Sequence, residues 1–248
     1  MTTSRIALVT GAASGIGAAI ATRLAADGAS VALLARRRDR LEKLAAQISE
    51  SGGTALVVPA DVTDPEEVAQ AADLVQDRFG DLDLLVNNAG MMKVVPFGDG
   101  SAADWRRTVD VNLAGVLTVT HVFLPALKRS ATTRTTDLIN VSSLAADRFM
   151  PGMAAYGASK AGVSYLTRAL RQELASEGIR VTNVEPGMID GTELADQFPE
   201  ELRTMVDELR TSLPAVPPSE VAELIAYVVG RPREVNLPDL IIQPSKEI

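Results

Sequence analysis

The sequence predicts an α/β protein with one doubly wound parallel sheet of about seven strands, flanked by helices. Two observations carry this prediction. Short, fully apolar runs, which are typical of strands buried on both faces, alternate with helix-patterned stretches along almost the whole chain. No linker, repeat or low-complexity segment interrupts the alternation. Residues 1–248 are therefore predicted to form a single domain with right-handed crossovers.

The expected elements follow one another closely. Strands are expected at 6–9, 30–35, 54–59, 82–87, 137–142, 179–185 and 237–243. Helices are expected at 15–26, 38–50, from Asp64 onward, at 102–128, 155–177 and 217–229. The helix over 38–50 has Leu41, Leu44 and Ile48 on one side. The helix that starts at Asp64 has an N-cap, a proline at its first position and acids in its first turn.

The regular pattern is lost after Pro186-Gly187. An insert at about 190–212 is polar-rich, with acids and arginines mixed. It follows the C-terminal end of a strand, where open α/β sheets bind ligands. This place in the chain predicts a mobile lid over a substrate, and an ordinary helical hairpin is the alternative.

Composition excludes several classes of protein. No stretch reaches the ~18 consecutive apolar residues of a membrane span, and the N-terminus lacks the apolar core of a signal peptide. The chain has no cysteine, so it has neither disulfides nor thiolate sites, and we expect it in the cytoplasm. A net charge of −8 argues against a nucleic-acid partner. No cluster of carboxylates has the spacing of a metal site, so no metal is expected.

A glycine-rich turn with the sequence Thr10-Gly-Ala-Ala-Ser-Gly-Ile-Gly17 joins the first strand to the first helix. Glycines at such a turn allow a tight bend, a close approach of backbone to a pyrophosphate and close helix–strand packing. The N–H groups at the helix N-terminus then bind the phosphates. The turn is predicted to bind a dinucleotide through Gly11, Ala13, Ser14, Gly15, Ile16 and Gly17.

The end of the second strand indicates which dinucleotide is bound. An acidic residue there would bind the ribose of NAD, but this chain has Arg36-Arg37-Arg38 instead. Guanidinium groups suit phosphate oxygens, so Arg36 and Arg37 are predicted to bind the 2′-phosphate of NADP(H). The alternative is a solvated basic face, which is what we expect for Arg38.

Tyr156 and Lys160 are the candidate catalytic pair. They are four residues apart in a helix-patterned run, so their side chains would lie on the same face. A neighbouring ammonium lowers the pKa of a phenol, towards the range in which it exchanges a proton with an alcohol or carbonyl oxygen. Ser143 stands thirteen positions upstream of Tyr156, at the end of a strand. Taken alone, a Tyr and a Lys at this spacing are usually surface residues.

Together these residues resemble the short-chain dehydrogenase/reductase family over nearly the whole chain. The motifs that carry the resemblance are Thr10 to Gly17, Asn87-Asn88-Ala89-Gly90, Asn112, Ser143, Tyr156 with Lys160, and Pro186-Gly187. The resemblance implies a Rossmann-type fold, hydride transfer between a nicotinamide and a carbonyl/alcohol pair, and a homotetramer or homodimer built on the two long helices. It also implies further cofactor contacts from Asp61, Val62, Asn88, Ala89, Gly90, Pro186, Gly187, Ile189 and Thr192.

The resemblance also implies a role for each catalytic residue. Tyr156 would be the general acid in reduction, and Lys160 would lower its pKa and hold the nicotinamide ribose. Ser143 would donate a hydrogen bond to the same substrate oxygen. Asn112 would position a water in a proton relay to Lys160.

The chain departs from the family pattern at one position. The family commonly has threonine five positions after the proline of Pro186-Gly187, where this chain has Gly191, and Thr192 follows one position later. The sequence Asn183-Val-Glu-Pro-Gly187 and the C-terminal segment resemble the corresponding sequences of the 3-hydroxy acid (serine) dehydrogenase and clavulanate dehydrogenase branches.

The identity of the substrate lies beyond the sequence. The methionine and phenylalanine side chains at Met91, Met92, Phe149, Met150 and Met153 would form either an adaptable apolar pocket or part of the core. Arg148 would meet a substrate carboxylate or face water. The protein is expected to be an active reductase of a small-molecule carbonyl or alcohol, and a catalytically silent NADP(H)-binding sensor or scaffold is the alternative.

Overall fold

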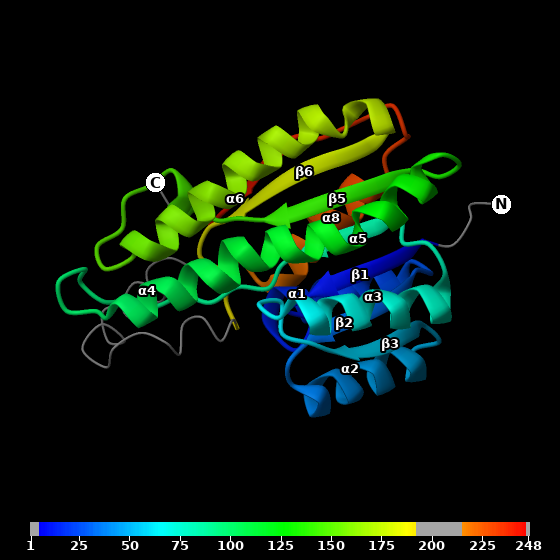
Figure 1. Cartoon of the computed structure of the whole chain (residues 1–248), viewed down its shortest axis with the longest axis horizontal. Coiled ribbons are helices and arrows are strands. Elements are labelled where there is room, and N and C mark those ends of the chain that lie inside the picture. Colours follow the sequence, from blue (N-terminus) through cyan, green and yellow to red (C-terminus); the bar gives the residue numbers. More distant parts are fainter. Residues whose placement is uncertain (1–4, 192–214, 247–248) are drawn as a thin grey trace.

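One parallel sheet of seven strands forms the centre of the protein, in the order β3-β2-β1-β4-β5-β6-β7. The computed structural model describes residues 5–191 and 215–246 (Figure 1). The strands are β1 (Ile6–Thr10), β2 (Ser30–Ala35), β3 (Thr54–Pro59), β4 (Leu84–Asn87), β5 (Thr136–Val141), β6 (Ile179–Pro186) and β7 (Asp239–Ile242). The predicted fold class is confirmed.

Helices cover both faces of this sheet (Figure 1). They are α1 (Gly15–Ala26), α2 (Arg38–Glu50), α3 (Pro65–Phe79), α4 (Ala102–Val109), α5 (Gly115–Ala131), α6 (Ala154–Glu173) and α8 (Pro218–Val229). β1 pairs with β2 on one side and with β4 on the other. The strand order therefore reverses at β1 and β4, and the carboxyl ends of these two strands are the place where such sheets bind ligands.

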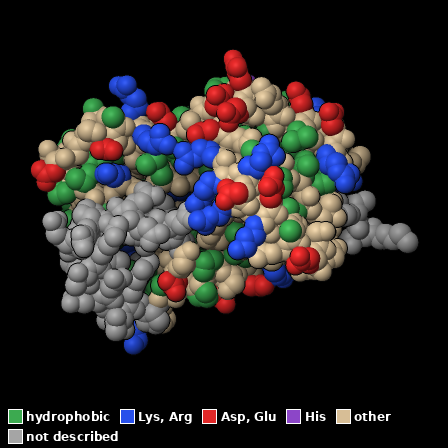
Figure 2. Space-filling view, turned by 90° about the horizontal axis from the view of Figure 1, so that it is seen from below, with side chains coloured by type: hydrophobic (Ala, Val, Ile, Leu, Met, Phe, Trp, Pro, Cys, Tyr) green, Lys and Arg blue, Asp and Glu red, His purple; other side chains and the backbone are tan. Residues whose placement is uncertain are grey.

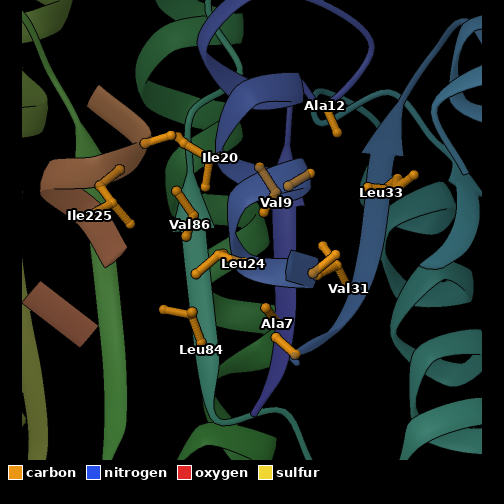
Figure 3. Close-up of a cluster of buried hydrophobic side chains, with 14 of the residues drawn as sticks. Ala7, Val9, Ala12, Ile20, Leu24, Val31, Leu33, Leu84, Val86 and Ile225 are labelled. Carbon is orange, nitrogen blue, oxygen red and sulfur yellow. The ribbon is translucent and has the colours of Figure 1, made fainter. Parts of the chain in front are cut away.

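The sheet separates two apolar cores because successive side chains of a strand point to opposite faces. Val9 of β1 packs with Ile20, Leu24 and Ile225 on the α1, α2 and α8 face (Figure 3). Leu8, its neighbour in the strand, is buried with residues of α3 and α5 on the other face. Burial of both faces explains why these strands read as continuous apolar runs.

The long helix expected at 102–128 is interrupted. A π-helical turn, Asp110–Ala114, separates α4 from α5 and contains Asn112. Turns of this kind occur as single insertions in helices, frequently at functional sites. The whole run Ala102–Ala131 is long and apolar enough to cross a membrane by length and composition alone. In this structure its residues Phe123 and Leu127 are fully buried against the sheet.

Other element boundaries shift by a few residues. β4 begins at Leu84 rather than at 82. The Asp83 carboxylate, just before it, binds Arg5 and the backbone N–H of Ile6. α6 ends at Glu173, and a short 3-10 turn precedes Gly178, whose φ of 75° is the left-handed conformation that glycine favours. The last strand covers Asp239–Ile242 rather than 237–243.

Buried ion pairs join the amino ends of four strands, at the edge opposite the glycine turn. Asp137 of β5 binds Arg180 of β6 at 2.7 Å and Arg5, just before β1, also at 2.7 Å. Asp83, just before β4, binds Arg5 and Arg134. The two carboxylates have side chains that are 1% exposed. The sequence analysis gave these residues no role.

Candidate active site

The glycine turn is packed so tightly that side chains would not fit. Gly11 has a φ of 67°, and a Cβ there would lie 2.9 Å from the Cα of Ala89. A Cβ on Gly17 would lie 2.3 Å from the carbonyl oxygen of Gly11. Glycine is therefore required at both positions, because α1 and the loop after β4 approach the backbone of this turn directly.

Thr10 fastens the glycine turn to the loop after β4. Its Oγ1 accepts hydrogen bonds from the backbone N–H groups of Asn88 and Ala89, both at 2.9 Å. The side-chain amide of Asn88 donates in turn to the carbonyl oxygen of Thr10 at 2.9 Å. The sequence analysis placed Thr10 in the motif but missed this function. The signal was its hydroxyl at the last position of an otherwise apolar strand.

The N-terminus of α1 is suited to an anion. Ser14 is its N-cap residue, but the Ser14 side chain accepts no capping bond, and the first turn contains no acid. Backbone N–H groups at such a terminus, with the helix dipole, attract phosphate. The predicted contacts Ala13, Gly15 and Ile16 belong to the same turn and to the start of α1. The turn fits the diphosphate of a dinucleotide.

Two arginines reach towards this turn from the end of β2. The Arg37 guanidinium donates to Ser14 Oγ at 3.2 Å. Arg36 lies 3.7 Å from the carboxylate of Asp61. Burial acts to raise the pKa of Asp61, but hydrogen bonds from Thr63 and the charges of Arg36 and Arg107 hold it below its usual range. Lys and Arg side chains gather across the middle of the face seen from the α2 side in Figure 2.

Val62, the residue after Asp61, packs against α5. Its side chain is 7% exposed, and a Cβ on Gly115 would lie 2.8 Å from its Cγ2. The absence of a side chain at Gly115 therefore lets α5 pack on Val62. Of the two predicted cofactor contacts Asp61 and Val62, it is Asp61 that meets Arg36.

Tyr156 and Lys160 project from the same face of α6, as predicted. Both side chains are nearly buried, with exposures of 7% and 5%. Lys160 Nζ lies 5.9 Å from the centroid of the Tyr156 ring and donates to the carbonyl oxygen of Val141 at 2.8 Å. A Cβ on Gly90 would lie 3.5 Å from that Nζ. Lys160 therefore lies against the loop that ends in Gly90.

The pKa values of this pair differ from the expectation. Burial raises the pKa of Tyr156, and a hydrogen bond with Ser143 only partly opposes the rise. Burial also lowers the pKa of Lys160 to about 8. The expected net lowering of the phenol pKa is therefore wrong for this arrangement, in which the cost of burial decides the direction of the shift. The physical reason is that removal from water disfavours the charged form of both groups.

Ser143 is held at the end of β5, beside Tyr156. Its Oγ accepts a hydrogen bond from the backbone N–H of Ala145 at 3.2 Å, which fixes the serine at the start of a 3-10 turn (Leu144–Ala146). The same side chain lies close enough to the Tyr156 phenol to oppose the rise of the phenol pKa. Two hydroxyl groups that can donate to one substrate oxygen therefore lie together.

Asn112 holds the loop after β4 and the start of α6 together. Its amide accepts from the backbone N–H of Met91 at 2.8 Å and donates to the Met91 carbonyl at 2.9 Å. Its second N–H donates to Ser159 Oγ at 3.0 Å, and Ser159 donates to the carbonyl oxygen of Tyr156 at 2.7 Å. Both N–H donors of Asn112 are therefore used by protein groups. The sequence analysis missed Ser159, and the water relay through Asn112 stays a prediction.

The last predicted contacts lie at the end of β6. Pro186 closes the strand, and the N–H of Gly187 donates to the carbonyl of Ile242 at 2.8 Å. Ile189 forms an isolated parallel bridge with Val216. Gly191 has a φ of 61°. Thr192 and most of the predicted lid at 190–212 lie outside the described residues.

The methionine-rich segments divide between core and surface. Met92 and Met153 are 7% and 8% exposed and pack with Tyr156 in one cluster. Phe149 and Met150 are instead 90% and 42% exposed. In the described parts of the chain, no group of three or more His, Asp and Glu side chains is placed to hold a metal ion.

Comparison with known proteins identifies this arrangement. A family model described as short chain dehydrogenase matches residues 5–203. The chain belongs to this family. An uncharacterized oxidoreductase of Staphylococcus aureus (strain N315) is 35% identical over 242 residues, which are 98% of each chain.

Solved structures of other short-chain dehydrogenases agree with this assignment. An alcohol dehydrogenase from Thermococcus sibiricus, complexed with 5-hydroxy-NADP, has a TM-score of 0.87 and 29% identity, with 99% of this chain and 98% of that one covered. A closed form of serine dehydrogenase complexed with NADP+ has a TM-score of 0.90 and 29% identity, with 98% and 96% covered. An actinorhodin polyketide ketoreductase variant with NADPH has a TM-score of 0.87 and 34% identity, with 98% and 97% covered.

Membership in the short-chain dehydrogenase family explains why these groups converge. The glycine turn, the loop after β4 and the first turns of α6 all lie at the carboxyl ends of strands. This edge of the sheet brings a hydroxyl pair, a lysine and an anion site together from residues far apart in the sequence. The arrangement is that of an oxidoreductase with a nicotinamide dinucleotide.

Proposed function

We propose that this protein is an NADP(H)-dependent oxidoreductase that interconverts a ketone or aldehyde with the corresponding alcohol. The observation that carries the proposal is the convergence of Ser143, Tyr156 and Lys160 beside the glycine-lined dinucleotide site. The nicotinamide supplies or accepts the hydride when it is bound. The protein groups bind the substrate oxygen and move its proton.

Tyr156 and Ser143 act on the substrate oxygen. In reduction both hydroxyls donate hydrogen bonds to the carbonyl oxygen, and Tyr156 transfers its proton to that oxygen. The buried ammonium of Lys160 stabilises the phenolate that results. In oxidation the phenolate takes the proton from the alcohol. Because burial raises the pKa of Tyr156, the phenol is protonated at neutral pH, which suits the direction of reduction.

Arg36 and Arg37 favour NADP(H) over NAD(H). Their guanidinium groups lie at the carboxyl end of β2, and Arg37 reaches Ser14 at the glycine turn. Charge-assisted hydrogen bonds from such groups suit a 2′-phosphate. Three structural neighbours hold NADP, NADPH or a derivative of NADP, which supports the same preference.

We further propose that the protein acts in the cytoplasm and forms a homotetramer or homodimer through its long helices. Exposed apolar side chains support the assembly, with Leu117 of α5 48% exposed and Tyr165 of α6 74% exposed. Analytical ultracentrifugation tests the oligomeric state, and a Tyr165→Glu variant that remains fully assembled would argue against this interface.

NADPH oxidation at 340 nm with a panel of ketones and aldehydes tests the activity. We expect turnover, and we expect Tyr156→Phe to lower it by about 10²–10⁴, the usual contribution of general acid–base catalysis. Tyr156→Phe keeps the ring, so its NADPH binding and melting temperature should match those of the unchanged protein. Tight NADPH binding without turnover of any compound would instead favour a sensor or scaffold.

A further inference from the structure

Arg148 lies in the segment that joins Ser143 to Tyr156. Its backbone N–H donates to the carbonyl oxygen of Leu144 at 3.0 Å, which closes the turn that follows Ser143. The position of Arg148 is therefore fixed relative to the candidate catalytic serine by hydrogen bonds of the main chain.

The Arg148 side chain is held at the carboxyl ends of the strands. Its Nη2 donates to Gln243 Oε1 at 2.9 Å in a half-buried contact. Gln243 directly follows β7, and the last residue of that strand, Ile242, accepts from Gly187 at the end of β6. The guanidinium is thus anchored between the turn after Ser143 and the end of β6, at the edge of the sheet where the active site lies.

No acid neutralises this guanidinium within the described ranges, 5–191 and 215–246. Arginine has five N–H donors, and the bond to Gln243 uses one of them. Other buried or half-buried arginines contrast with it: Arg5, Arg134, Arg171 and Arg180 each form an ion pair with an aspartate. The contrast is informative in a chain with 32 acidic and 24 basic residues.

A half-buried cation without an acidic partner, in the segment that joins the two candidate catalytic hydroxyls, indicates an anionic ligand. Partial burial of an unpaired charge is unfavourable, and a carboxylate matches the planar fork of a guanidinium. We propose that Arg148 binds a carboxylate of the substrate, so that the substrates are oxo acids and the corresponding hydroxy acids. Gln243 acts as a positioning residue for Arg148. The reaction in this inference is that of the proposed function, on which the inference rests, and the class of substrate is inferred from Arg148.

Matched substrates separate recognition of the charge from reduction of the carbonyl. We would measure kcat/KM for an oxo acid and for its methyl ester with the unchanged protein, Arg148→Met and Arg168→Met. Charge-assisted hydrogen bonds are worth roughly ten- to a hundredfold. The unchanged protein should prefer the acid by about this factor, and Arg148→Met should lose the preference while it keeps activity on the ester. Arg168→Met, which removes an exposed arginine from α6, should change neither substrate.

Binding provides a readout that does not need turnover. Isothermal titration of the oxo acid into the protein with NADP+ should show binding to the unchanged protein and to Arg168→Met, and weaker binding by roughly tenfold or more to Arg148→Met. This result without turnover of any carbonyl compound would support Arg148 as a carboxylate site and reject the proposed reaction. Melting temperature and NADPH affinity show that the variants are folded.

Two results would overturn the inference while the proposed reaction stands. The first is equal kcat/KM for acid and ester in the unchanged protein. The second is an Arg148→Met variant that retains the preference for the acid but loses its oligomeric state in size-exclusion chromatography, because Arg148 would then be a contact between subunits.

Discussion

At the scale of single residues, burial decides the chemistry of Tyr156 and Lys160. Both groups are taken out of water at the start of α6, so burial raises the pKa of the phenol and lowers that of the amine. The two shifts keep both groups closer to neutral than their ordinary values would. An anion bound beside Lys160, such as the phenolate formed during turnover, would restore the ammonium.

The lowered pKa of Lys160 predicts how stability depends on pH. The folded protein loses the Lys160 proton at about 8, whereas the unfolded chain keeps it to about 10.4. The unfolded state therefore binds more protons between these values, and this group makes the free energy of unfolding rise with pH. Urea unfolding of the unchanged protein and of Lys160→Met should differ by a slope of up to about 1.4 kcal/mol per pH unit between pH 8 and 10.

The same comparison below pH 7 is the control. Below pH 7 both states of the unchanged protein hold the proton, so the difference in unfolding free energy between the two proteins should not vary with pH. A parallel pH dependence of the two proteins up to pH 10 would show that the Lys160 pKa is not lowered.

At the scale of elements, the π-turn and α6 are joined through hydroxyl and amide groups. Ser159 receives a hydrogen bond from Asn112 and gives one to the carbonyl of Tyr156. Five residues later, Ser164 is also buried but donates to Glu185 of β6 and accepts from Asn183. The two serines therefore form a matched pair, of which Ser159 alone contacts the catalytic machinery.

Ser159→Ala should lower kcat about two- to tenfold, the usual worth of one hydrogen bond, because the start of α6 loses its link to Asn112. NADPH affinity should remain unchanged. Ser159→Thr keeps the hydroxyl, which can still bond to a carbonyl in the preceding turn, and should restore kcat. Ser164→Ala should lower the melting temperature without this loss of kcat. Equal kcat values for the two alanine variants would mean that Ser159 does not position Tyr156.

The end of β2 carries the choice of cofactor. Replacement of Arg36 and Arg37 by alanine should weaken NADPH binding by about ten- to a hundredfold for each charge-assisted hydrogen bond lost. NADH binding should be nearly unchanged. Arg38→Ala is the matched control, because Arg38 is 65% exposed and pairs with Glu42 within its own helix. Equal affinity of the unchanged protein for NADH and NADPH would contradict the assignment.

At the scale of the whole molecule, the two edges of the sheet have different functions. The carboxyl edge carries the candidate active site, and the amino edge carries the buried ion pairs around Asp83 and Asp137. Arg180 extends these pairs to the C-terminal region through the carbonyl oxygens of Arg231, Pro232 and Val235. The ion pairs therefore join four strands to the segment that leads to β7.

Asp137→Asn should destabilise the fold and leave the active site intact. Loss of the Asp137 carboxylate leaves the buried charge of Arg180 without an acidic partner and leaves Arg5 with Asp83 alone, and breaking a buried pair in this way typically costs about 3–5 kcal/mol. Asp81→Asn breaks an exposed pair with Arg129 and should cost less than about 1 kcal/mol. Urea unfolding measures both. A small effect of Asp137→Asn, together with unchanged NADPH binding, would show that the network contributes little to stability.

The sequence by itself determined the order of strands and helices, the glycine turn and the places of Ser143, Tyr156 and Lys160. These features depend on local chemistry: the period of apolar residues, the freedom of glycine and the spacing of one helical turn. The links made by Thr10 and Ser159, and the ion pairs around Asp137, were decided by tertiary structure. Their partners are distant in the sequence, and only the parallel sheet brings them within bonding distance. Burial of a side chain is also a consequence of tertiary packing. The directions of the Tyr156 and Lys160 pKa shifts, which follow from desolvation, were therefore decided by the fold as well.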